Sequence, residues 1–472
     1  MFYQKTSSAG QSFSEVRNAC AESEGLPFSD VLSEEQIQRA FAEEGALFGE
    51  GEKVVYTPSI TLWAHLSQVL HTGPFRSCAA AVSRVIVLCV VLGRRVPSED
   101  TGAYCRARAK IPVAVVRRLA KEVASALESQ VPPSWLWKER HVKMVDGTTL
   151  SPCDTVANQE KWPQPPSQKA GIGFPILRMV GLLSLATGAV CDLEMGPYEG
   201  KETGEPALLR AMLDRLEAKD ILLGDCCFCS YFMIALLLAR KVDVVFRQHQ
   251  RRTTDFRRGR SLGREDHVVV WEKPERPEWM DEETYAQIPE TLTVRELKVR
   301  VHIRGFRTQT MVVVTTLTDA RHYPKSEVAG LYRARWHVEL DLRSLKCALD
   351  MEDLRGKSPE MVEREIWTHC LAYNLIRKKM AQAAFVSGRP PRSLSFTAAL
   401  QAVSSAWMQA STASPETRGE LTRQILKIIA GHRVGQRPNR VEPRAVKRRP
   451  KSQKLLTKPR DKARAELLKH TP

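Results

Sequence analysis

The spacing of hydrophobic residues predicts a helical first part of the chain. Between residues 31 and 130, apolar residues recur every three to four positions, as on one face of a helix. Ser33 followed by Gln36 has the spacing of a capping box at a helix start. Pro112 opens a second clear helix, PVAVVRRLAKEVASALE, whose other face is basic. That face favours either solvent exposure or DNA docking, and it consists of Arg117, Arg118 and Lys121.

From about residue 136 the pattern changes to short apolar runs separated by helical segments. The helical segments are GEPALLRAMLDRLEAKD (204–220), which is amphipathic, and SYFMIALLLAR (230–240), which is apolar throughout. The predicted strands are HVKMVDG (141–147), two within FPILRMVGLLSL and AVCDLEM, DILLGD (220–225) and VDVVFRQ (242–248). Strands that alternate with helices predict a mixed α/β sheet covered on both faces.

This alternation ends at residue 249. The basic, irregular run HQRRTTDFRRGRSLGRE comes first, and the β-type runs VVVWEK and VRELKVRVHI follow it. We interpret residues 249–309 as a β-rich insertion, with TMVVVTTL (310–317) rejoining the main sheet. A long helix is predicted over 326–350, and apolar helices are predicted to about residue 385.

The net charge makes nucleic acid the expected partner. The chain has 71 Lys and Arg against 54 Asp and Glu, a net charge of +17, and residues 433–472 alone contain 14 basic and 3 acidic residues. Basic side chains near phosphates release condensed counterions. An anionic membrane surface would require a basic amphipathic helix or a lipidation motif. The remaining alternative is a tail that only increases solubility.

The cysteines indicate a reducing compartment. There are 11, an odd number, scattered without a repeating framework. Cys226, Cys227 and Cys229 are clustered, but a structural zinc site needs a second pair of ligands nearby. We interpret them as small apolar residues at the start of a buried helix.

No segment is expected to span a membrane. The two most apolar stretches, 79–93 and 171–191, are interrupted by Arg84 and Arg178. The uninterrupted runs are much shorter than the ~20 residues that a bilayer span requires. We expect a soluble protein that lies in the cytoplasm and has no membrane partner.

One face of the helix predicted over 326–350 carries an unusual set of polar residues. At offsets of 0, 3, 7, 11 and 14 they nearly share a face, and they are Tyr332, Arg335, Glu339, Arg343 and Lys346. One carboxylate thus lies among four groups that can bind phosphate. The alternative interpretation is a surface helix with internal salt bridges.

Two aspartates at predicted strand ends add to this set. Asp146 ends HVKMVDG and Asp225 ends DILLGD, so both are expected at the strand edge where α/β sheets place their sites. Either aspartate alone is typical of a turn or a cap. Together with Glu339 they would supply the hard oxygen ligands that Mg²⁺ prefers. Two such ions about 4 Å apart can activate water and stabilise a leaving oxygen in phosphodiester cleavage.

These residues resemble a known family. The spacing Y-(2)-R-(3)-E-(6)-K resembles the signature of bacterial DDE transposases of the insertion sequence 4 family, and it is matched here by Tyr332, Arg335, Glu339 and Lys346. The VDGTT and GDCCFCSY segments resemble the family's first and second Asp segments. Family members often have Arg after the second Asp, whereas Cys226 stands there in this chain. The resemblance covers roughly residues 60–380 and, more loosely, the basic tail.

The resemblance implies an RNase H-like core whose catalytic and metal-binding triad is Asp146, Asp225 and Glu339, with Mg²⁺ as the cofactor and Mn²⁺ able to replace it. It also implies cut-and-paste transposition. Water cuts one strand at the element end, the freed 3′-OH attacks the other strand to form a hairpin, and the reopened end attacks target DNA. DNA contacts are expected from Tyr332, Arg335, Trp336, Arg343 and Lys346. An indole such as Trp336 can replace the stacking partner of a flipped base; the alternative for this residue is core packing.

The implied partners are the terminal inverted repeats of the element and target DNA, bound by a homodimer in a synaptic complex at the bacterial nucleoid. Two rival functions remain. One is a non-mobile, metal-dependent DNA nuclease on the same core, and the other is a catalytically decayed DNA-binding copy. The expected segments are an N-terminal helical DNA-binding region (1–135), the first part of the catalytic core (136–248), the β-rich insertion (249–309), the second part of the core (310–385) and a helical segment with the basic tail (386–472).

Overall fold

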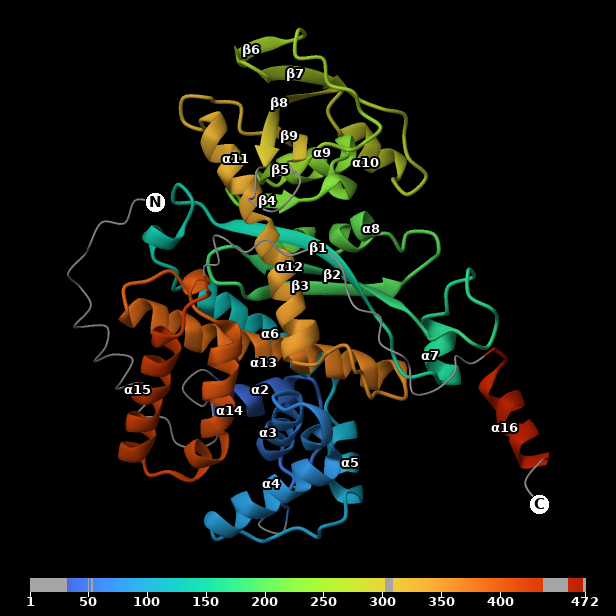
Figure 1. The fold of residues 1–472 in the computed structure, drawn as a ribbon, viewed down its shortest axis with the longest axis vertical. Coiled ribbons are helices and arrows are strands. Elements are labelled where there is room, and N and C mark those ends of the chain that lie inside the picture. The colour runs from blue at the N-terminus through green and yellow to red at the C-terminus, as the bar shows by residue number, and fades with distance from the viewer. Residues whose placement is uncertain (1–31, 50, 52–53, 302–308, 436–456, 470–472) are drawn as a thin grey trace.

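The computed structural model describes residues 32–49, 51, 54–301, 309–435 and 457–469. Its centre is one sheet with helices on both faces (Figure 1), in the order β3-β2-β1-β4-β5-β9-β8-β7-β6. The strands are β1 (Val142–Leu150), β2 (Leu177–Ser184), β3 (Val190–Pro197), β4 (Ile221–Gly224), β5 (Asp243–Arg247), β6 (Arg260–Gly263), β7 (Asp266–Glu272), β8 (Thr291–Val301) and β9 (Gln309–Thr315). The prediction of a mixed α/β fold is confirmed.

The first five strands form a mixed unit. Strands β1, β2 and β3 are antiparallel neighbours, whereas β4 and β5 run parallel to β1. Successive side chains of a strand point to opposite faces, so a sheet covered on both faces can have apolar residues at every position. Val145 and Leu222 accordingly belong to one hydrophobic core, and their chain neighbours Met144 and Leu223 belong to the other.

The insertion continues this sheet. Strand β9 pairs antiparallel with both β5 and β8, so the strand predicted at 310–317 rejoins the main sheet as expected. Buried Arg295 of β8 donates to both carboxylate oxygens of Asp266, at 2.8 and 2.6 Å, and to the carbonyl oxygen of Tyr323 at 2.6 Å. One arginine therefore ties β8 to β7 and to the segment that leads into the next helix.

The helical first part is present. Its helices are α2 (Glu34–Glu43), α3 (Pro58–Val69), α4 (Cys78–Val91), α5 (Gly102–Ala109) and α6 (Val113–Glu128). The capping box predicted at Ser33 and Gln36 forms at the start of α2. On α6, Arg117 pairs with Glu194, Arg118 pairs with Glu43 and Glu122, and Lys121 pairs with Asp192 at 2.6 Å. The cations of this basic face are therefore paired within the chain, and DNA docking by this face stays a prediction.

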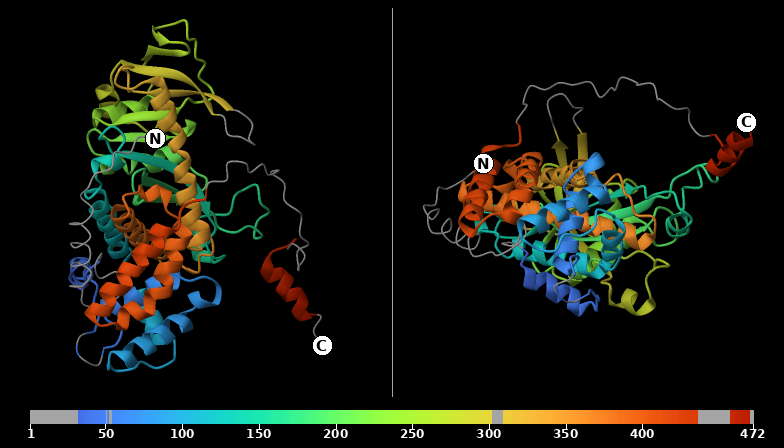
Figure 2. Two further views of the ribbon diagram at one scale, coloured as in Figure 1. Left: turned by 60° about the vertical axis from the view of Figure 1, so that its left-hand side comes forward. Right: turned by 90° about the horizontal axis from the view of Figure 1, so that it is seen from below.

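The last helices pack against the first ones. The 28-residue helix α13 (Pro359–Val386) contacts α3, α6, α14 and α15, and the left view of Figure 2 shows the N-terminal helices, α14 and α15 together below the sheet, with α16 apart from them. The remaining helices are α7 (Val156–Lys161), α8 (Glu205–Arg210), α9 (Tyr231–Ala239), α10 (Glu282–Gln287), α11 (Lys325–Ala334), α12 (Trp336–Arg343), α14 (Phe396–Thr412), α15 (Pro415–Gly431) and α16 (Arg460–Lys469). Residues 436–456 of the basic tail lie outside the described residues. Among the helices that the structure describes, none is both long and apolar enough to cross a bilayer.

Candidate active site

Asp146 and Asp225 lie on neighbouring parallel strands. Met144 of β1 is in register with Leu223 of β4. Asp146 lies two residues after Met144, and Asp225 lies two residues after Leu223. A two-residue step returns a side chain to the same face of the sheet. The register therefore brings together two aspartates that are 79 positions apart in the sequence.

The strand that carries Asp146 is longer than expected. Strand β1 does not end at Gly147 but continues to Leu150, because β2 keeps pairing with it beyond the end of β4. Asp146 is therefore in the middle of β1, opposite Gly181. Asp225 does follow the end of its strand, as predicted, and its carboxylate accepts a hydrogen bond from the Cys226 amide at 2.7 Å. That bond caps the short 3₁₀ helix η4 (Cys226–Phe228).

The predicted helix over 326–350 is divided into three segments. Helices α11 and α12 meet at Arg335, where two successive i→i+3 backbone bonds, Tyr332 to Arg335 and Arg335 to Val338, tighten the turn. A π-helical turn, η5 (Ser344–Ala348), then widens the helix around Lys346. The prediction of a single uninterrupted helix over 326–350 is therefore wrong. The spacing of polar residues could not reveal this, because these changes hardly alter which residues share a face.

Arg335 links the first aspartate to the glutamate. Its guanidinium lies 3.3 Å from Asp146 Oδ2 and 2.8 Å from Glu339 Oε1. The side chain of Arg335 is only 14% exposed, so this contact is shielded from water. The structure thus brings Asp146 and Glu339, which are far apart in the sequence, to the two terminal nitrogens of one guanidinium.

Tyr332 and Lys346 lie at the two ends of this region. Tyr332 is buried; burial raises its pKa, and Arg335 opposes that shift. Lys346 Nζ donates to the Thr148 hydroxyl at 3.2 Å and to the Thr149 carbonyl oxygen at 3.1 Å. Both acceptors belong to β1, just beyond Asp146, so Lys346 is held above the strand that carries the first aspartate.

Trp336 and Arg343 point outward. The Trp336 side chain is 54% exposed, which contradicts the alternative that it packs in the core. Arg343 is also exposed, and the described residues provide no ion pair for its guanidinium. Both side chains are accessible to a large partner.

A fourth carboxylate lies beside the first aspartate. A Cβ added at Gly147 would lie 2.2 Å from Glu205 Oε1, and the Cys227 thiol donates to Glu205 Oε2 at 3.4 Å. Burial raises the pKa of Asp146 to about 6; Arg335 opposes this shift, whereas Glu205 and Glu339 add to it. No sequence pattern singles out Glu205, an acidic residue at the start of α8, and this helix is shorter (Glu205–Arg210) than the predicted 204–220.

The donor set suits a hard divalent cation, although its oxygens are not gathered into a closed cage. Within the described ranges, no three His, Cys, Asp or Glu side chains converge closely enough to hold a metal ion. The Arg335 guanidinium occupies the space between Asp146 and Glu339 and neutralises part of their charge. Carboxylate oxygens are the ligands that Mg²⁺ and Mn²⁺ prefer. The carboxylates near Arg335 therefore fit such an ion chemically.

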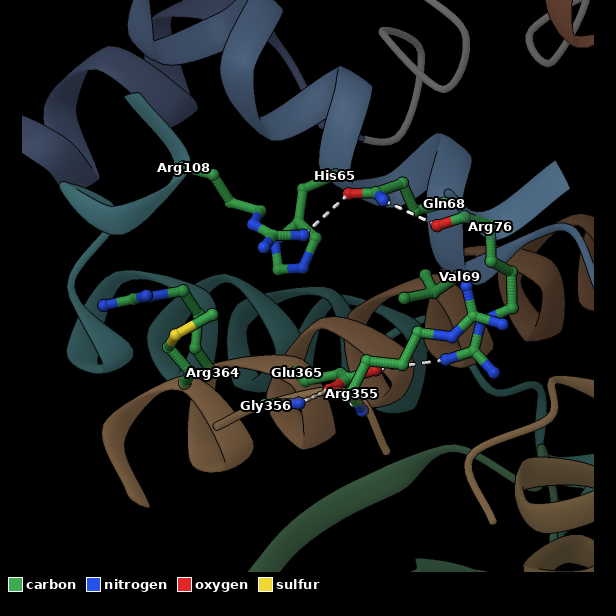
Figure 3. A pocket seen from close by; sticks show the side chains of 10 residues that line it. His65, Gln68, Val69, Arg76, Arg108, Arg355, Gly356, Arg364 and Glu365 are labelled. Atoms are coloured by element: carbon green, nitrogen blue, oxygen red, sulfur yellow. Dashed lines mark hydrogen bonds and ion pairs between the residues drawn. The ribbon is translucent and has the colours of Figure 1, made fainter. Parts of the chain in front are cut away.

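The turn after η5 is anchored to the N-terminal helices across a small polar cavity, shown in Figure 3. Arg76, which is 2% exposed, donates to the Asp350 carbonyl oxygen at 2.7 Å and to the Asp350 carboxylate at 3.0 Å. It also contacts Glu365 at 3.1 Å, and Glu365 accepts hydrogen bonds from the Arg355 and Gly356 amides at 2.9 and 3.0 Å. The first helices thereby fix the position of the loop that follows Lys346.

Comparison with known proteins gives one family match and several similar proteins. Residues 137–375 match the family described as Transposase DDE domain. The chain is 26% identical over 432 residues to the transposase InsG for insertion sequence element IS4 of Escherichia coli K12, covering 89% of this chain and 91% of that protein. It is 37% identical over 65 residues to the putative transposase InsL for insertion sequence element IS186A of the same organism, covering 14% of this chain and 18% of that protein. A cryo-EM structure of the piggyBac transposase synaptic complex with hairpin DNA aligns with a TM-score of 0.42 at 11% identity, covering 88% of this chain and 85% of that chain.

Proposed function

The chain belongs to the transposase DDE domain family, and from that premise we propose that it moves an insertion sequence by a cut-and-paste reaction. The proposed reaction is strand cleavage at the element ends, passage through a hairpin, and transfer of the freed end to target DNA. The observation that carries the proposal is that Arg335 pairs with both Asp146 and Glu339, while the register of β1 and β4 places Asp225 on the strand beside Asp146.

We propose that residues 136–248 and 310–385 form an RNase H-like core. The support is the strand order β3-β2-β1-β4-β5, with three antiparallel strands followed by two strands parallel to β1. Residues 249–309 would be an insertion into this core. Residues 1–135 would bind DNA, and residues 386–472 would supply a helical segment and a basic tail.

In this proposal, Asp146, Asp225 and Glu339 hold divalent ions, Mg²⁺ or Mn²⁺. Such ions activate the attacking oxygen and stabilise the leaving oxygen in an in-line phosphoryl transfer. The role of Arg335 is to neutralise the carboxylates before DNA binds and then to turn toward the scissile phosphate. Lys346, held above β1, would meet the negative charge that develops on the phosphate in the transition state.

The remaining residues of the helix would hold the DNA. Tyr332 and Arg343 are proposed to contact phosphates on either side of the cut, and the exposed indole of Trp336 is proposed to stack on a flipped base. Two element ends must be cut together, so we propose that a homodimer holds both ends in a synaptic complex.

Charge-removing substitutions test this assignment. Asp146→Asn, Asp225→Asn and Glu339→Gln should each abolish Mg²⁺-dependent cleavage of a supercoiled donor plasmid while leaving binding to the element end intact, because each removes a charged ligand and keeps its shape. Asp214→Asn, at a side chain that is 90% exposed, is the matched control and should cleave normally. Cleavage by Asp225→Asn at the wild-type rate would exclude that aspartate from the site.

A further inference from the structure

The first segment of the insertion concentrates positive charge on the surface. Residues 249–264 contain six arginines and one aspartate, and all six arginines are exposed. They occupy the loop before β6, strand β6 itself and the turn into β7. Strand β6 is the last strand of the sheet, at the end farthest from β3 (Figure 1).

This segment is fixed onto the sheet by contacts of its other side chains. The guanidinium of Arg252 lies 3.6 Å from the ring centre of the buried Trp271. The Phe256 ring lies 4.8 Å from the His267 ring, and His267 Nδ1 lies 2.7 Å from the Arg258 carbonyl oxygen. Because Trp271 and His267 belong to β7, the arginines are carried on an anchored surface.

Within the described residues, four of the six arginines have no acidic partner, and one of these four, Arg252, stacks on Trp271 instead. Asp255 pairs with Arg257 and Arg258, at 2.9 and 3.7 Å. The side chains of Arg251, Arg260 and Arg264 have no ion pair within the part of the chain that the structure describes. Three exposed guanidiniums that are not neutralised internally are suited to bind an anionic partner such as a phosphate backbone.

The sheet sets the distance from this surface to the active site. Asp225 follows β4, and β6 lies five strand positions farther along the order β4-β5-β9-β8-β7-β6. At about 4.8 Å per strand this is about 24 Å. Along a DNA duplex, which rises about 3.4 Å per base pair, the same distance corresponds to about seven base pairs. Arg247, at the end of β5, lies between Asp225 and strand β6 along the sheet. It is close enough to Tyr332 to oppose the increase in the pKa of Tyr332 that burial causes.

We propose that Arg251, Arg260 and Arg264 bind the phosphate backbone of the donor duplex about seven base pairs from the scissile phosphate. The proposal rests on the proposed function, since the active site defines where the scissile phosphate lies. It assigns the insertion a role in holding the DNA that is being cut. The competing explanation is that arginines on an edge strand only prevent pairing with another chain.

Duplexes of graded length test this proposal with the full-length protein. The DNA would extend by 2 to 14 base pairs from the cleavage point, on either side in separate series, and binding would be measured by fluorescence anisotropy without divalent ions. For the wild type, affinity should rise once the extension on one side passes about seven base pairs. Arg260→Gln/Arg264→Gln should lack this rise, and the slope of log affinity against log salt should fall by about 1.8, at ~0.9 for each lost phosphate contact.

A charge-matched control separates this surface from a general loss of positive charge. Lys219 and Lys241 are exposed and lie just before β4 and β5, at the ends of these strands opposite Asp225 and Arg247. Lys219→Gln/Lys241→Gln should keep the rise in affinity. Asp146→Asn should also keep it, because the measurement needs no chemistry; cleavage by that variant would instead refute the proposed active site.

Three results would overturn the proposal. The first is a rise in affinity that persists in Arg260→Gln/Arg264→Gln. The second is a loss confined to a separate duplex offered as target DNA, which would assign the surface to the target. The third is aggregation of Arg260→Gln/Arg264→Gln while its monomeric fraction keeps the rise in affinity. That result would mean that these arginines only prevent the edge strand from pairing with another chain.

Discussion

Asp146→Asn should make the metal-free protein more stable at neutral and basic pH. Burial raises the pKa of Asp146 from 3.8 to about 6, and this value already includes the opposing effect of Arg335. A shift of about two units corresponds to about 3 kcal/mol of unfavourable free energy for the charged form. Asparagine keeps the shape of the side chain and removes that cost. At pH 8 in EDTA, the variant should therefore exceed the wild type in free energy of unfolding by up to about 3 kcal/mol.

The pH dependence of this gain follows from the direction of the shift. The folded state binds a proton at Asp146 more tightly than the unfolded state does, so wild-type stability increases as the pH falls through about 6. At pH 5, one unit below the folded pKa, the advantage of the variant should shrink by about 1.4 kcal/mol. Urea unfolding at pH 5 and pH 8 measures the difference in free energy of unfolding between the variant and the wild type, with Asp214→Asn as the exposed control. A variant that is less stable than the wild type by the same amount at pH 5 and pH 8 would refute the reasoning.

Three further substitutions address the surroundings of the site. Lys346→Ala should greatly reduce single-turnover cleavage with a melting temperature close to that of the wild type, since within the described residues Lys346 Nζ contacts Thr148, Thr149 and Glu352 at the surface of the site; normal cleavage would contradict its proposed role. Trp336→Ala should melt like the wild type, because the indole is 54% exposed, and should slow hairpin formation more than the first nick on a sequencing gel; a large loss of stability would place the indole in the core instead. Arg76→Gln should lower the free energy of unfolding by about 3–5 kcal/mol in urea titrations, as expected when one partner of a buried ion pair is removed, and an unchanged midpoint would show that the pair is not formed.

The sequence predicted those parts of the fold that depend on local patterns. The strands that carry Asp146 and Asp225 are recognisable as apolar runs, and each aspartate follows its run directly. The face shared by Tyr332, Arg335 and Glu339 follows from the helical period alone. The family resemblance then placed these local features in one site.

Features that depend on contacts between distant segments could not be predicted. The extension of β1 to Leu150 depends on pairing with β2. Thr148 and Thr149 show no apolar pattern from which this extension could be predicted. The position of Glu205 against Gly147 depends on how α8 packs on the sheet. The internal pairing of Arg117 and Lys121 likewise depends on Glu194 and Asp192 of β3, which a reading of α6 alone cannot include.

Replacement of Asp225 by cysteine tests most directly whether this carboxylate binds the catalytic metal ion. A thiolate is a softer ligand than a carboxylate and binds Mg²⁺ poorly, whereas Mn²⁺ accepts it more readily. Asp225→Cys should therefore fail to cleave an element end in Mg²⁺ and recover a substantial part of its cleavage in Mn²⁺, while Asp225→Ser, which offers no charged ligand, should recover in neither. Wild-type cleavage by Asp225→Cys in Mg²⁺, or equal inactivity of the two variants in both metals, would contradict the assignment of Asp225 as a metal ligand.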